Sequence, residues 1–413
     1  MKILFLSDNF PPEVNAAASR VYERACYWIQ DKHQVSVLTC APNFPLGKVF
    51  EGYKNKWIQK ETMKDIEVTR VKTFMAPNRG FALRILDFLS YMVMAILVGT
   101  FQPKPDVIVA TSPQFFTAVA GWVLSKIKRV PFVFEISDLW PESIKGLGML
   151  GDSFAYKVLE RIELFLYRQA ALIVAQTNAF KENLVSRGIE ASKIKVILNG
   201  VEVNKYSRAL KKDETLSHKY KLEGKFIVGY IGTHGLSQNL KGVVDCAKIV
   251  EAKSKDILFL FVGDGAEREE VIQYAKTLGV TNTLFIPLQP KSEIKKWWSL
   301  CDLSLVTLKN LPIFKTTIPS KIFESFGMGL PIFLVSPEGE ASELITKNKL
   351  GIHVTPEDIE LFADELIKLS KDQPKIKVMS EVSLRAAKIY SREKQAHEFI
   401  EFIGQNIGSA KAA

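Results

Sequence analysis

Short apolar runs alternate with longer, helix-length segments along the first half of the chain. These runs are almost continuously apolar, as strands buried on both faces of a parallel sheet should be. The predicted strands are residues 2–7, 35–39, 107–112, 132–137, 172–176 and 195–200. Segments such as Ala16–Gln30 and Ser153–Ala170 lie between them and have the length of helices. This rhythm predicts an α/β fold with a doubly wound parallel sheet.

A polar, lysine-rich segment, residues 204–224, interrupts the rhythm and is interpreted as a linker. The alternation then restarts, with predicted strands at residues 226–232, 257–263, 283–287, 303–308, 332–336 and 351–355. Ser391–Ile407 has the spacing of a last amphipathic helix. We therefore expect two Rossmann-like domains, 1–203 and 204–390, and a C-terminal helical segment, 391–413, that packs back toward the first domain. The two sheets should face each other across a cleft at the carboxyl ends of their strands.

Composition narrows the class of protein without naming an activity. The 413 residues are 47% hydrophobic and 24% charged, which is ordinary for a soluble globular protein. The formal charge is +10, and residues 1–200 supply most of it, with 25 Lys and Arg against 18 Asp and Glu. Such an excess attracts nucleic acid or an anionic membrane. The four cysteines have neither disulfide-framework nor zinc-ligand spacing, so we expect a reducing cytosol and no metal site.

Two glycine turns follow predicted strands in the second half of the chain. The first comprises Gly232, Thr233, His234 and Gly235, and the second contains Gly263 and Asp264. Glycines at a strand-to-helix turn allow backbone amides to approach a phosphate closely. His234 is the histidine, among five in the chain, that lies inside such a turn, and it either meets an anion or is an exposed turn residue.

A third segment, Ile318–Pro331, begins a helix with proline, serine and lysine. Ser320 and Lys321 would lie at the helix N-terminus, where unpaired amides and the helix dipole attract negative charge. Glu324 follows almost one turn later on the same face, and a carboxylate there can accept both hydroxyl hydrogens of a ribose. Together the three segments predict a site for a nucleoside diphosphate, although each alone is also compatible with an ordinary turn.

The order of these motifs resembles the retaining glycosyltransferases of family 4, which have the GT-B fold, and most closely their branch of L-fucosamine transferase-like enzymes of bacterial surface polysaccharide synthesis. The likeness covers nearly the whole chain. It rests on FLSDNFPPEVNAAASR (5–20), FEISDLWPESI (134–144), ILNGV (197–201), GYIGTHGLSQNL (229–240), FVGDGAEREE (261–270), IPSKIFESFGMGLPI (318–332) and GEASELI (339–345). It implies metal-independent transfer of a sugar from a nucleoside diphosphate sugar, with uridine as the base, to a hydroxyl acceptor. No other cofactor is implied.

The chain departs from the wider family at two places in the donor region. Relatives have two glutamates separated by seven residues, whereas here Glu324 is preceded by Thr316 in place of the first. This difference is compatible with a deoxy or amino sugar such as N-acetyl-L-fucosamine. Relatives also place arginine and lysine near the diphosphate, and here the candidates are His234, Lys241 and Lys321. We expect the backbone amides of residues 232–235 and Lys321 to carry most of this role.

Acceptor-side residues are expected in the first domain. Asn15, Ala16 and Ala17 follow the first strand and replace the paired glycines of relatives. Asp138 ends the strand at 132–137 and could position the acceptor hydroxyl or share its proton, while Glu142 follows it. The alternatives are that Asp138 caps a helix and that Glu142 is a surface charge.

The resemblance also suggests a mechanism. The diphosphate leaves on the face that the acceptor attacks and helps to take the acceptor proton, while Lys321, His234 and amides stabilise the charge. Glu343, in the GEASELI segment, either contacts the sugar or caps its own helix.

Membrane contact is expected because family acceptors are often polyprenyl-diphosphate-linked sugars, as in O-antigen or capsule assembly. Residues 48–64 carry five lysines interleaved with aromatic residues, and 79–84 add two arginines. These features favour peripheral attachment to an anionic leaflet through the first domain, at the cytoplasmic face of the cytoplasmic membrane. Phe88–Phe101 is interpreted as a buried helix because it is shorter than a membrane span. The opening residues form a strand, so no signal peptide is expected.

Two other functions share parts of this pattern. A sugar-nucleotide 2-epimerase has the same two-domain architecture but needs acid and base side chains around the sugar, of which few are present. A non-catalytic sugar-nucleotide-binding protein would bind the donor without turnover. A nucleic-acid-binding module is not recognisable in the sequence.

Overall fold

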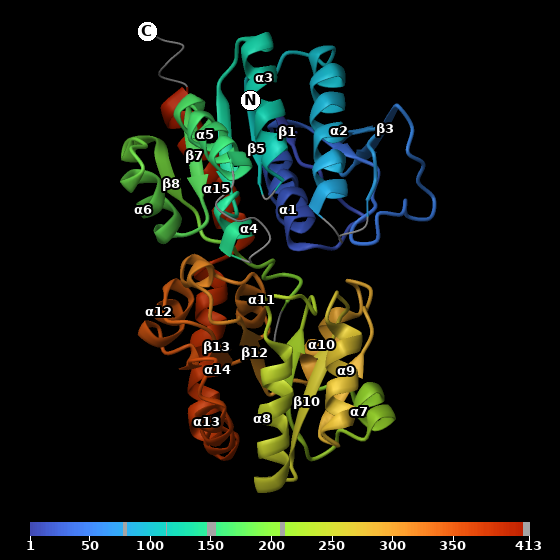
Figure 1. The fold of residues 1–413 in the computed structure, drawn as a ribbon, viewed down its shortest axis with the longest axis vertical. Helices are drawn as coiled ribbons and strands as arrows, with labels where there is room; N and C mark the ends of the chain where they lie inside the picture. Colours follow the sequence, from blue (N-terminus) through green and yellow to red (C-terminus); the bar gives the residue numbers. More distant parts are fainter. Residues whose placement is uncertain (77–80, 113, 147–153, 207–210, 408–413) are drawn as a thin grey trace. The chain divides into compact units, whose positions relative to one another are not determined.

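A computed structural model describes residues 1–76, 81–112, 114–146, 154–206 and 211–407. The chain divides into two compact units (Figure 1). Unit 1 comprises Met1–Leu198 and Arg392–Ala413, and unit 2 comprises Asn199–Ser391. The first boundary thus follows Leu198 instead of Val203, and the C-terminal segment belongs to unit 1.

Unit 1 is built on an eight-stranded sheet in the order β3-β4-β2-β1-β5-β6-β7-β8. Its strands are β1 (Lys2–Leu6), β2 (Gln34–Cys40), β3 (Ile58–Met63), β4 (Ile66–Val71), β5 (Val107–Thr111), β6 (Phe132–Ile136), β7 (Leu172–Ala175) and β8 (Ile194–Val196). Its helices are α1 (Ala16–Gln30), α2 (Phe81–Thr100), α3 (Phe115–Lys128), α4 (Glu142–Gly146), α5 (Phe154–Gln169), α6 (Asn178–Ser186) and α15 (Arg392–Ile407), with a 3-10 turn η1 (Ala191–Lys193). The sheet is parallel except at its β3 edge, which pairs antiparallel with β4.

The β3–β4 hairpin is absent from the predicted strands, which pass directly from residue 39 to residue 107. This hairpin was missed because β3 has no apolar run. Exposed and partly buried residues alternate along β3, which lies at the edge of the sheet. Lys64 and Asp65 form the turn with positive φ values of 47° and 64°. The basic segment at residues 48–64 therefore includes an edge strand.

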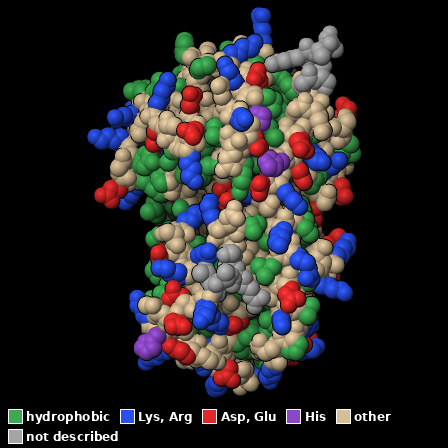
Figure 2. Space-filling model, turned by 180° about the vertical axis from the view of Figure 1, so that it is seen from behind, with side chains coloured by type: hydrophobic (Ala, Val, Ile, Leu, Met, Phe, Trp, Pro, Cys, Tyr) green, Lys and Arg blue, Asp and Glu red, His purple; other side chains and the backbone are tan. Residues whose placement is uncertain are grey.

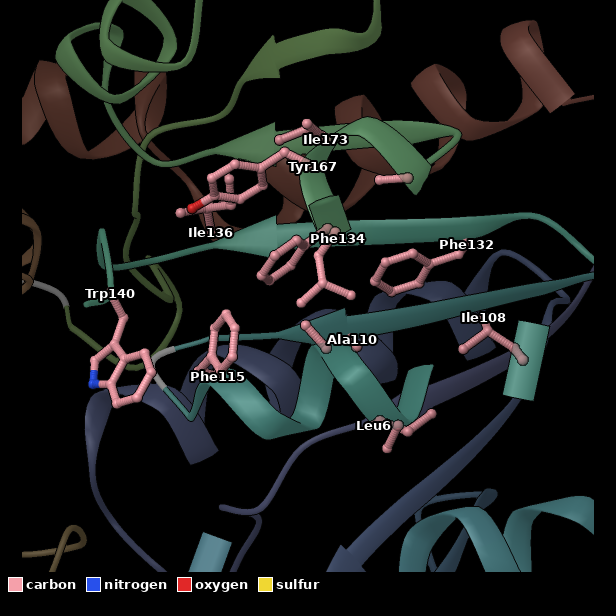
Figure 3. Close-up of a cluster of buried hydrophobic side chains, with 14 of the residues drawn as sticks. Leu6, Ile108, Ala110, Phe115, Phe132, Phe134, Ile136, Trp140, Tyr167 and Ile173 are labelled. Atoms are coloured by element: carbon pink, nitrogen blue, oxygen red, sulfur yellow. The ribbon is translucent and has the colours of Figure 1, made fainter. Parts of the chain in front are cut away.

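The sheet of unit 1 is covered on both faces, as its apolar strands predict. Leu4 and Leu6 of β1 point into a core formed with α2, α3 and α5, whereas Ile3 and Phe5 point into a core formed with α1 and α15. This alternation follows from the two-residue period of a strand. Figure 3 shows part of the first core, in which aromatic side chains of β6 and α3 pack beside those of the loop that follows β6.

The C-terminal helix α15 folds onto α1 within unit 1. Trp28 donates from Nε1 to the carbonyl oxygen of Ala396 at 2.9 Å, and its ring centre lies 5.4 Å from that of Phe399. Arg392 pairs with Glu23 at 3.3 Å, and both side chains are buried. The chain therefore returns to its first unit after completing the second.

Unit 2 contains a six-stranded, entirely parallel sheet in the order β11-β10-β9-β12-β13-β14. Its strands are β9 (Phe226–Ile231), β10 (Ile257–Val262), β11 (Thr283–Ile286), β12 (Leu303–Thr307), β13 (Ile332–Val335) and β14 (Gly351–Val354). Its helices are α7 (Glu214–Tyr220), α8 (Leu240–Lys253), α9 (Arg268–Thr277), α10 (Ile294–Leu300), α11 (Lys321–Gly327), α12 (Glu340–Lys347), α13 (Ile359–Lys371) and α14 (Gln373–Ile389), with a 3-10 turn η2 (Pro312–Thr316). The order reverses between β9 and β12, and open α/β sheets bind ligands beyond the carboxyl ends of the strands at such a reversal.

Two interpretations of polar and apolar segments need correction. The supposed linker at 204–224 contains α7, which Asp213 caps by accepting the amide hydrogen of Leu216 at 2.9 Å. The apolar segment interpreted as a buried helix is the 20-residue α2, and only 22% of its window Leu83–Thr100 is buried. Residues 79 and 80 of the predicted basic segment lie outside the described residues.

Candidate functional site

The two glycine turns of unit 2 lock together at the reversal of strand order. His234 donates its amide hydrogen to the carbonyl oxygen of Asp264 at 2.9 Å, and Gly232 donates to Val262 at 2.9 Å. A Cβ atom on Gly263 would lie 2.0 Å from the carbonyl oxygen of Gly232, and φ at Gly263 is +145°. Only glycine permits this approach.

This interlock changes the explanation of the glycines. They were expected to admit a phosphate to the backbone, and the structure adds a second reason, because Gly263 makes room for the neighbouring turn. The amides of Gly232 and His234 are already used by carbonyl groups of the second turn. Thr233 and Gly235 supply the other two amides of the first turn, and Thr233 is exposed.

His234 is fully buried, which excludes the alternative of an exposed turn residue. Its ring centre lies 5.6 Å from that of Tyr230 and 6.3 Å from that of Phe261. Neither ring nitrogen has a hydrogen-bond partner in the part of the chain that the structure describes. Burial, together with the charges of Lys321 and Arg268, lowers the pKa of His234 to about 4. The imidazole is therefore neutral at physiological pH.

Lys321, the first residue of α11, reaches the first glycine turn. Its Nζ atom lies 3.6 Å from the centre of the Tyr230 ring and donates to Oε1 of Gln238 at 3.5 Å. A Cβ atom on Gly232 would lie 3.4 Å from the same Nζ atom. Burial lowers the pKa of Lys321 to about 7, and the negative charge of Glu324 partly opposes this decrease. The amine therefore changes its charge near neutral pH.

Glu324 lies one turn further along α11 and is partly buried, as is Ser320, which precedes the helix. Asp264 is exposed and accepts the amide hydrogen of Gly265 at 2.7 Å, so its side chain shapes the second turn. Thr316 donates its hydroxyl hydrogen to the carbonyl oxygen of Ile313 at 2.9 Å, within its own 3-10 turn.

Two candidates from the sequence have other partners. Glu343 is 60% exposed and pairs with Lys347 at 2.7 Å. It does not cap α12, because Ser342 accepts the amide hydrogen of Gly339 at 2.9 Å and fills that role. Lys241 is partly exposed and pairs with Glu270 at 2.6 Å, so the nearby lysine of the first turn is engaged by a surface carboxylate.

Sequence reasoning missed two residues that hold Lys321 in place. Tyr230 is fully buried in β9, and its hydroxyl lies 2.6 Å from the carbonyl oxygen of Thr233 and 3.1 Å from Oε1 of Gln238. Tyr230 was missed because it lies within an apolar run and has the sequence context of an ordinary core residue. Gln238 could have been found only from its place in the segment GYIGTHGLSQNL, on which the family resemblance rests.

The turn of unit 1 that was expected on the acceptor side is held in place by two asparagines, Asn9 and Asn15. Asn15 caps α1 by accepting the amide hydrogen of Ala18 at 2.8 Å, and it donates to Oδ1 of Asn9 at 2.6 Å. Ala16 is exposed and Ala17 is partly exposed at the start of the helix. These two positions therefore present small side chains at the start of α1.

A buried ion cluster fastens the same helix to the sheet. Arg24 pairs with Glu135 of β6 at 2.7 Å, and Arg20 pairs with the same carboxylate oxygen at 3.2 Å. This cluster was not predicted from the sequence, because Glu135 lies in an otherwise apolar strand. Loss of either the arginines or Glu135 would leave an uncompensated buried charge. The cluster therefore fixes the position of α1 relative to β6.

Asp138 and Glu142 flank Trp140 at the carboxyl end of β6. The Trp140 ring stacks on Phe115 with ring centres 4.9 Å apart and is almost fully buried (Figure 3). Ser143 and the amide of Leu139 donate to Asp138, as a capping carboxylate would require, and burial raises its pKa to about 6. Asn183 donates to Glu142 at 3.4 Å. Both carboxylates are thus positioned by local contacts and remain partly accessible.

Among residues 1–76, 81–112, 114–146, 154–206 and 211–407, three or more His, Cys, Asp or Glu side chains do not come together in a way that could hold a metal ion.

Two family models match the chain, one on each unit. The model described as "Glycosyl transferase 4-like domain" matches residues 15–200, and the one described as "Glycosyl transferases group 1" matches residues 212–385. Together they account for most of both units. Their order along the chain is that expected from the motifs.

Individual proteins and structures agree with these models. The chain is 25% identical to the putative colanic acid biosynthesis glycosyl transferase WcaI of Escherichia coli K12, over 80% of this chain and 82% of that protein. It is 24% identical to the E. coli UDP-Gal:alpha-D-GlcNAc-diphosphoundecaprenol alpha-1,3-galactosyltransferase, over 73% and 76%. The crystal structure of Anabaena HepE with UDP and glucose superposes with a TM-score of 0.73 at 19% identity, covering 98% and 99% of the two chains.

Proposed function

Because this chain is a glycosyltransferase of the GT-B fold that belongs to family 4, we propose that it transfers a sugar from a UDP-linked donor to a polyprenyl-diphosphate-linked saccharide. The anomeric configuration would be retained. The observation that carries the proposal is Lys321, whose amine lies between the first glycine turn and α11 at the reversal of strand order in unit 2.

The donor diphosphate would lie beside Lys321 and the exposed part of the first turn. Lys321 supplies a positive charge, and the amides of Thr233 and Gly235 supply hydrogen-bond donors. Glu324 accepts the hydroxyl hydrogens of the ribose, and Ser320 precedes it at the start of α11. Gly232, Gly263 and Asp264 shape the interlocked turns that position these groups.

His234 would contribute through its unpartnered ring nitrogens. A neutral imidazole donates one hydrogen bond and accepts another, so a modest shift of the turn would allow it to donate to a phosphate oxygen. As the anomeric bond breaks, Lys321 and His234 stabilise the departing diphosphate, which takes the acceptor proton on the same face. The proposed reaction needs no metal ion.

The proposed acceptor groups belong to unit 1. Asn15, Ala16 and Ala17 are small residues that would admit the acceptor at the turn after β1, and Asp138 and Glu142 offer carboxylates after β6. The raised pKa of Asp138, about 6, makes this carboxyl group able to hold or release a proton near neutral pH.

The donor sugar is proposed to be N-acetyl-L-fucosamine or a related deoxyamino sugar. Thr316 supports this choice of sugar. Relatives have a glutamate at this position, and its carboxylate would favour a sugar with more hydroxyl groups. In this proposal Glu343 contacts the sugar only after leaving Lys347. Among relatives, WcaI is named for colanic acid synthesis, and HepE was crystallised with UDP and glucose.

The enzyme is further proposed to act in O-antigen or capsule assembly, peripherally bound at the cytoplasmic face of the cytoplasmic membrane. The basic surface of unit 1 and the lipid-linked substrate named for the E. coli galactosyltransferase support this placement. The comparisons favour a transferase over the epimerase and the non-catalytic binding protein.

Retention is tested by the product itself. The transferred sugar should have the same anomeric configuration as the donor when the first-formed product is analysed by NMR. An inverted linkage would reject the proposed same-face displacement while leaving transfer itself intact.

A further inference from the structure

The α2 helix is apolar around most of its circumference, yet only a narrow stripe of it is buried. Tyr91, Ala95 and Gly99 form that stripe. The Tyr91 hydroxyl donates to the carbonyl oxygen of Leu38 in β2 at 2.7 Å, and a Cβ atom on Gly99 would lie 2.6 Å from Leu124 of α3. The stripe therefore fixes α2 against the sheet and its neighbouring helix.

The opposite side of α2 exposes large aliphatic side chains. Leu83, Leu86, Val93 and Leu97 are 51%, 49%, 48% and 54% exposed, and helical spacing places them on one side. Phe101, which follows the helix, is 88% exposed. Phe74 extends this side, because its amide donates to Ser90 of α2 and its ring is 43% exposed. These six residues are called the α2 face.

Length and composition alone would allow α2 to cross a membrane, since the window Leu83–Thr100 has a mean hydropathy of 1.7. The packing of its inner stripe on β2 and α3 opposes that arrangement. A helix that is apolar on both sides and packed on only one of them needs a second apolar environment. An interfacial helix meets this need by lying in the plane of the membrane.

Positive charge lies at both ends of the α2 face. Near Phe74, Lys72 lies over the ring of Trp57 at 4.6 Å, and Trp57 is 67% exposed. At the other end, Lys128 donates to the carbonyl oxygens of Thr100 and Gln102, which brings the end of α3 beside the end of α2.

Exposed cations at this second end are Lys104, Lys126 and Arg129, none of which pairs with a carboxylate of another described residue. Figure 2 shows hydrophobic side chains gathered on part of unit 1, with lysines and arginines along their border. The only carboxylate in the α2 sequence is Asp87, which is partly buried. Apolar side chains between cations match an anionic bilayer surface.

We propose that the α2 face is inserted into the interfacial layer of a lipid bilayer that contains anionic phospholipids, with α2 lying parallel to the membrane plane. This proposal deepens the membrane attachment included in the proposed function by assigning an apolar contact to it. A second copy of the chain is the competing occupant of the same face. The charges at its two ends favour lipid, because two copies would bring these cations together.

Vesicle flotation of the full chain tests the proposal without any donor or acceptor sugar, so its result is independent of transfer activity. The vesicles contain phosphatidylcholine alone or phosphatidylcholine with phosphatidylglycerol. The test variant is Val93→Glu/Leu97→Glu, and the matched control is Leu361→Glu/Val378→Glu, at exposed apolar positions of unit 2. Both variants add two negative charges, and thermal unfolding checks that each folds.

The wild-type chain and the control should float with the anionic vesicles, and the test variant should bind them at least about tenfold more weakly. Equal binding by the test and control variants would overturn the proposal, as would failure of the wild-type chain to bind. Light scattering measures whether the wild-type chain and the test variant are monomers or dimers. A wild-type dimer that becomes monomeric in the test variant, with vesicle binding unchanged, would assign the face to a second copy.

Discussion

The Nζ atom of Lys321 lies 3.6 Å from the centre of the Tyr230 ring, with the glycine turn on one side and α11 on the other. The aromatic face attracts a cation, whereas burial opposes the charge and lowers the pKa of Lys321 to about 7. A diphosphate placed beside this amine would favour its protonated form. Donor binding and protonation of Lys321 should therefore be linked.

The first prediction is that UDP binding takes up a proton at pH 8 to 9. Below about pH 7 the amine is already charged, so affinity should be highest there and should fall as pH rises through this value. Calorimetry in two buffers of different ionisation enthalpy measures the uptake. Lys321→Arg keeps its charge throughout and should remove the proton uptake. An equal uptake in this variant would assign the proton to another group.

Glu324→Ala should weaken UDP binding, because it removes the charged acceptor proposed for the ribose. The expected loss is roughly 1.5–3 kcal/mol, or about tenfold to 150-fold in affinity. The control is Glu343→Ala, which removes a carboxylate paired with Lys347 on the surface of the same unit. Calorimetry should find UDP affinity almost unchanged in the control. If both variants bind UDP as the wild type does, the ribose has been misplaced.

Gly263→Ala should destabilise unit 2, since the new Cβ atom would lie 2.0 Å from the carbonyl oxygen of Gly232. Crowding of this kind costs typically about 1–3 kcal/mol, and the positive φ adds strain. Gly235→Ala is the matched change in the neighbouring turn, where the nearest atom would be 3.6 Å away. Urea unfolding compares them. Equal unfolding free energies would contradict the interlock of the two turns.

The variant His234→Phe tests whether His234 binds the ligand or only shapes the glycine turn. Phenylalanine keeps a planar ring, although a larger one, and removes two ring nitrogens that lack described partners. His234→Phe should therefore fold, with a loss of stability no larger than about 1–3 kcal/mol from the added volume. If a ring nitrogen meets the diphosphate, the variant should nevertheless bind UDP roughly tenfold more weakly. Thermal unfolding and UDP titration are measured together. Normal UDP affinity and normal turnover in a folded variant would confine His234 to shaping the turn.

Much of the architecture follows from apolar runs, because a buried parallel strand must be apolar on both faces. The β3–β4 hairpin was not predicted, because every second residue of its edge strand is exposed and the strand has no apolar run. The burial of α2 was overestimated, because an apolar sequence does not show which side of a helix is covered. The two strands β9 and β10 and the position of Lys321 at the start of a helix were predicted from the sequence. The contact of Lys321 with Tyr230 was not, because it depends on strands and helices that meet only in the folded unit.

The glycines show why a motif can be identified correctly and explained incompletely. Gly232 and Gly263 suggested a phosphate loop, and their spacing after two strands located the turns. Their immediate reason is the close contact between the two turns, which depends on β9 and β10 being neighbours. In unit 1, Glu135 was hidden in the same way, because its partners Arg20 and Arg24 come from a distant helix.

Mass spectrometry of a transfer reaction tests whether the enzyme moves a sugar from a UDP-linked donor to a lipid-linked acceptor. Nucleotide sugars are supplied one at a time with a polyprenyl-diphosphate-linked saccharide, and each donor is also incubated without acceptor. One UDP-sugar should give an acceptor heavier by one sugar residue and release UDP, and Lys321→Ala should lower this turnover more than it weakens donor binding. Conversion of the donor to an isomer without acceptor, or binding without a product for every donor and acceptor pair, would contradict the proposed transfer.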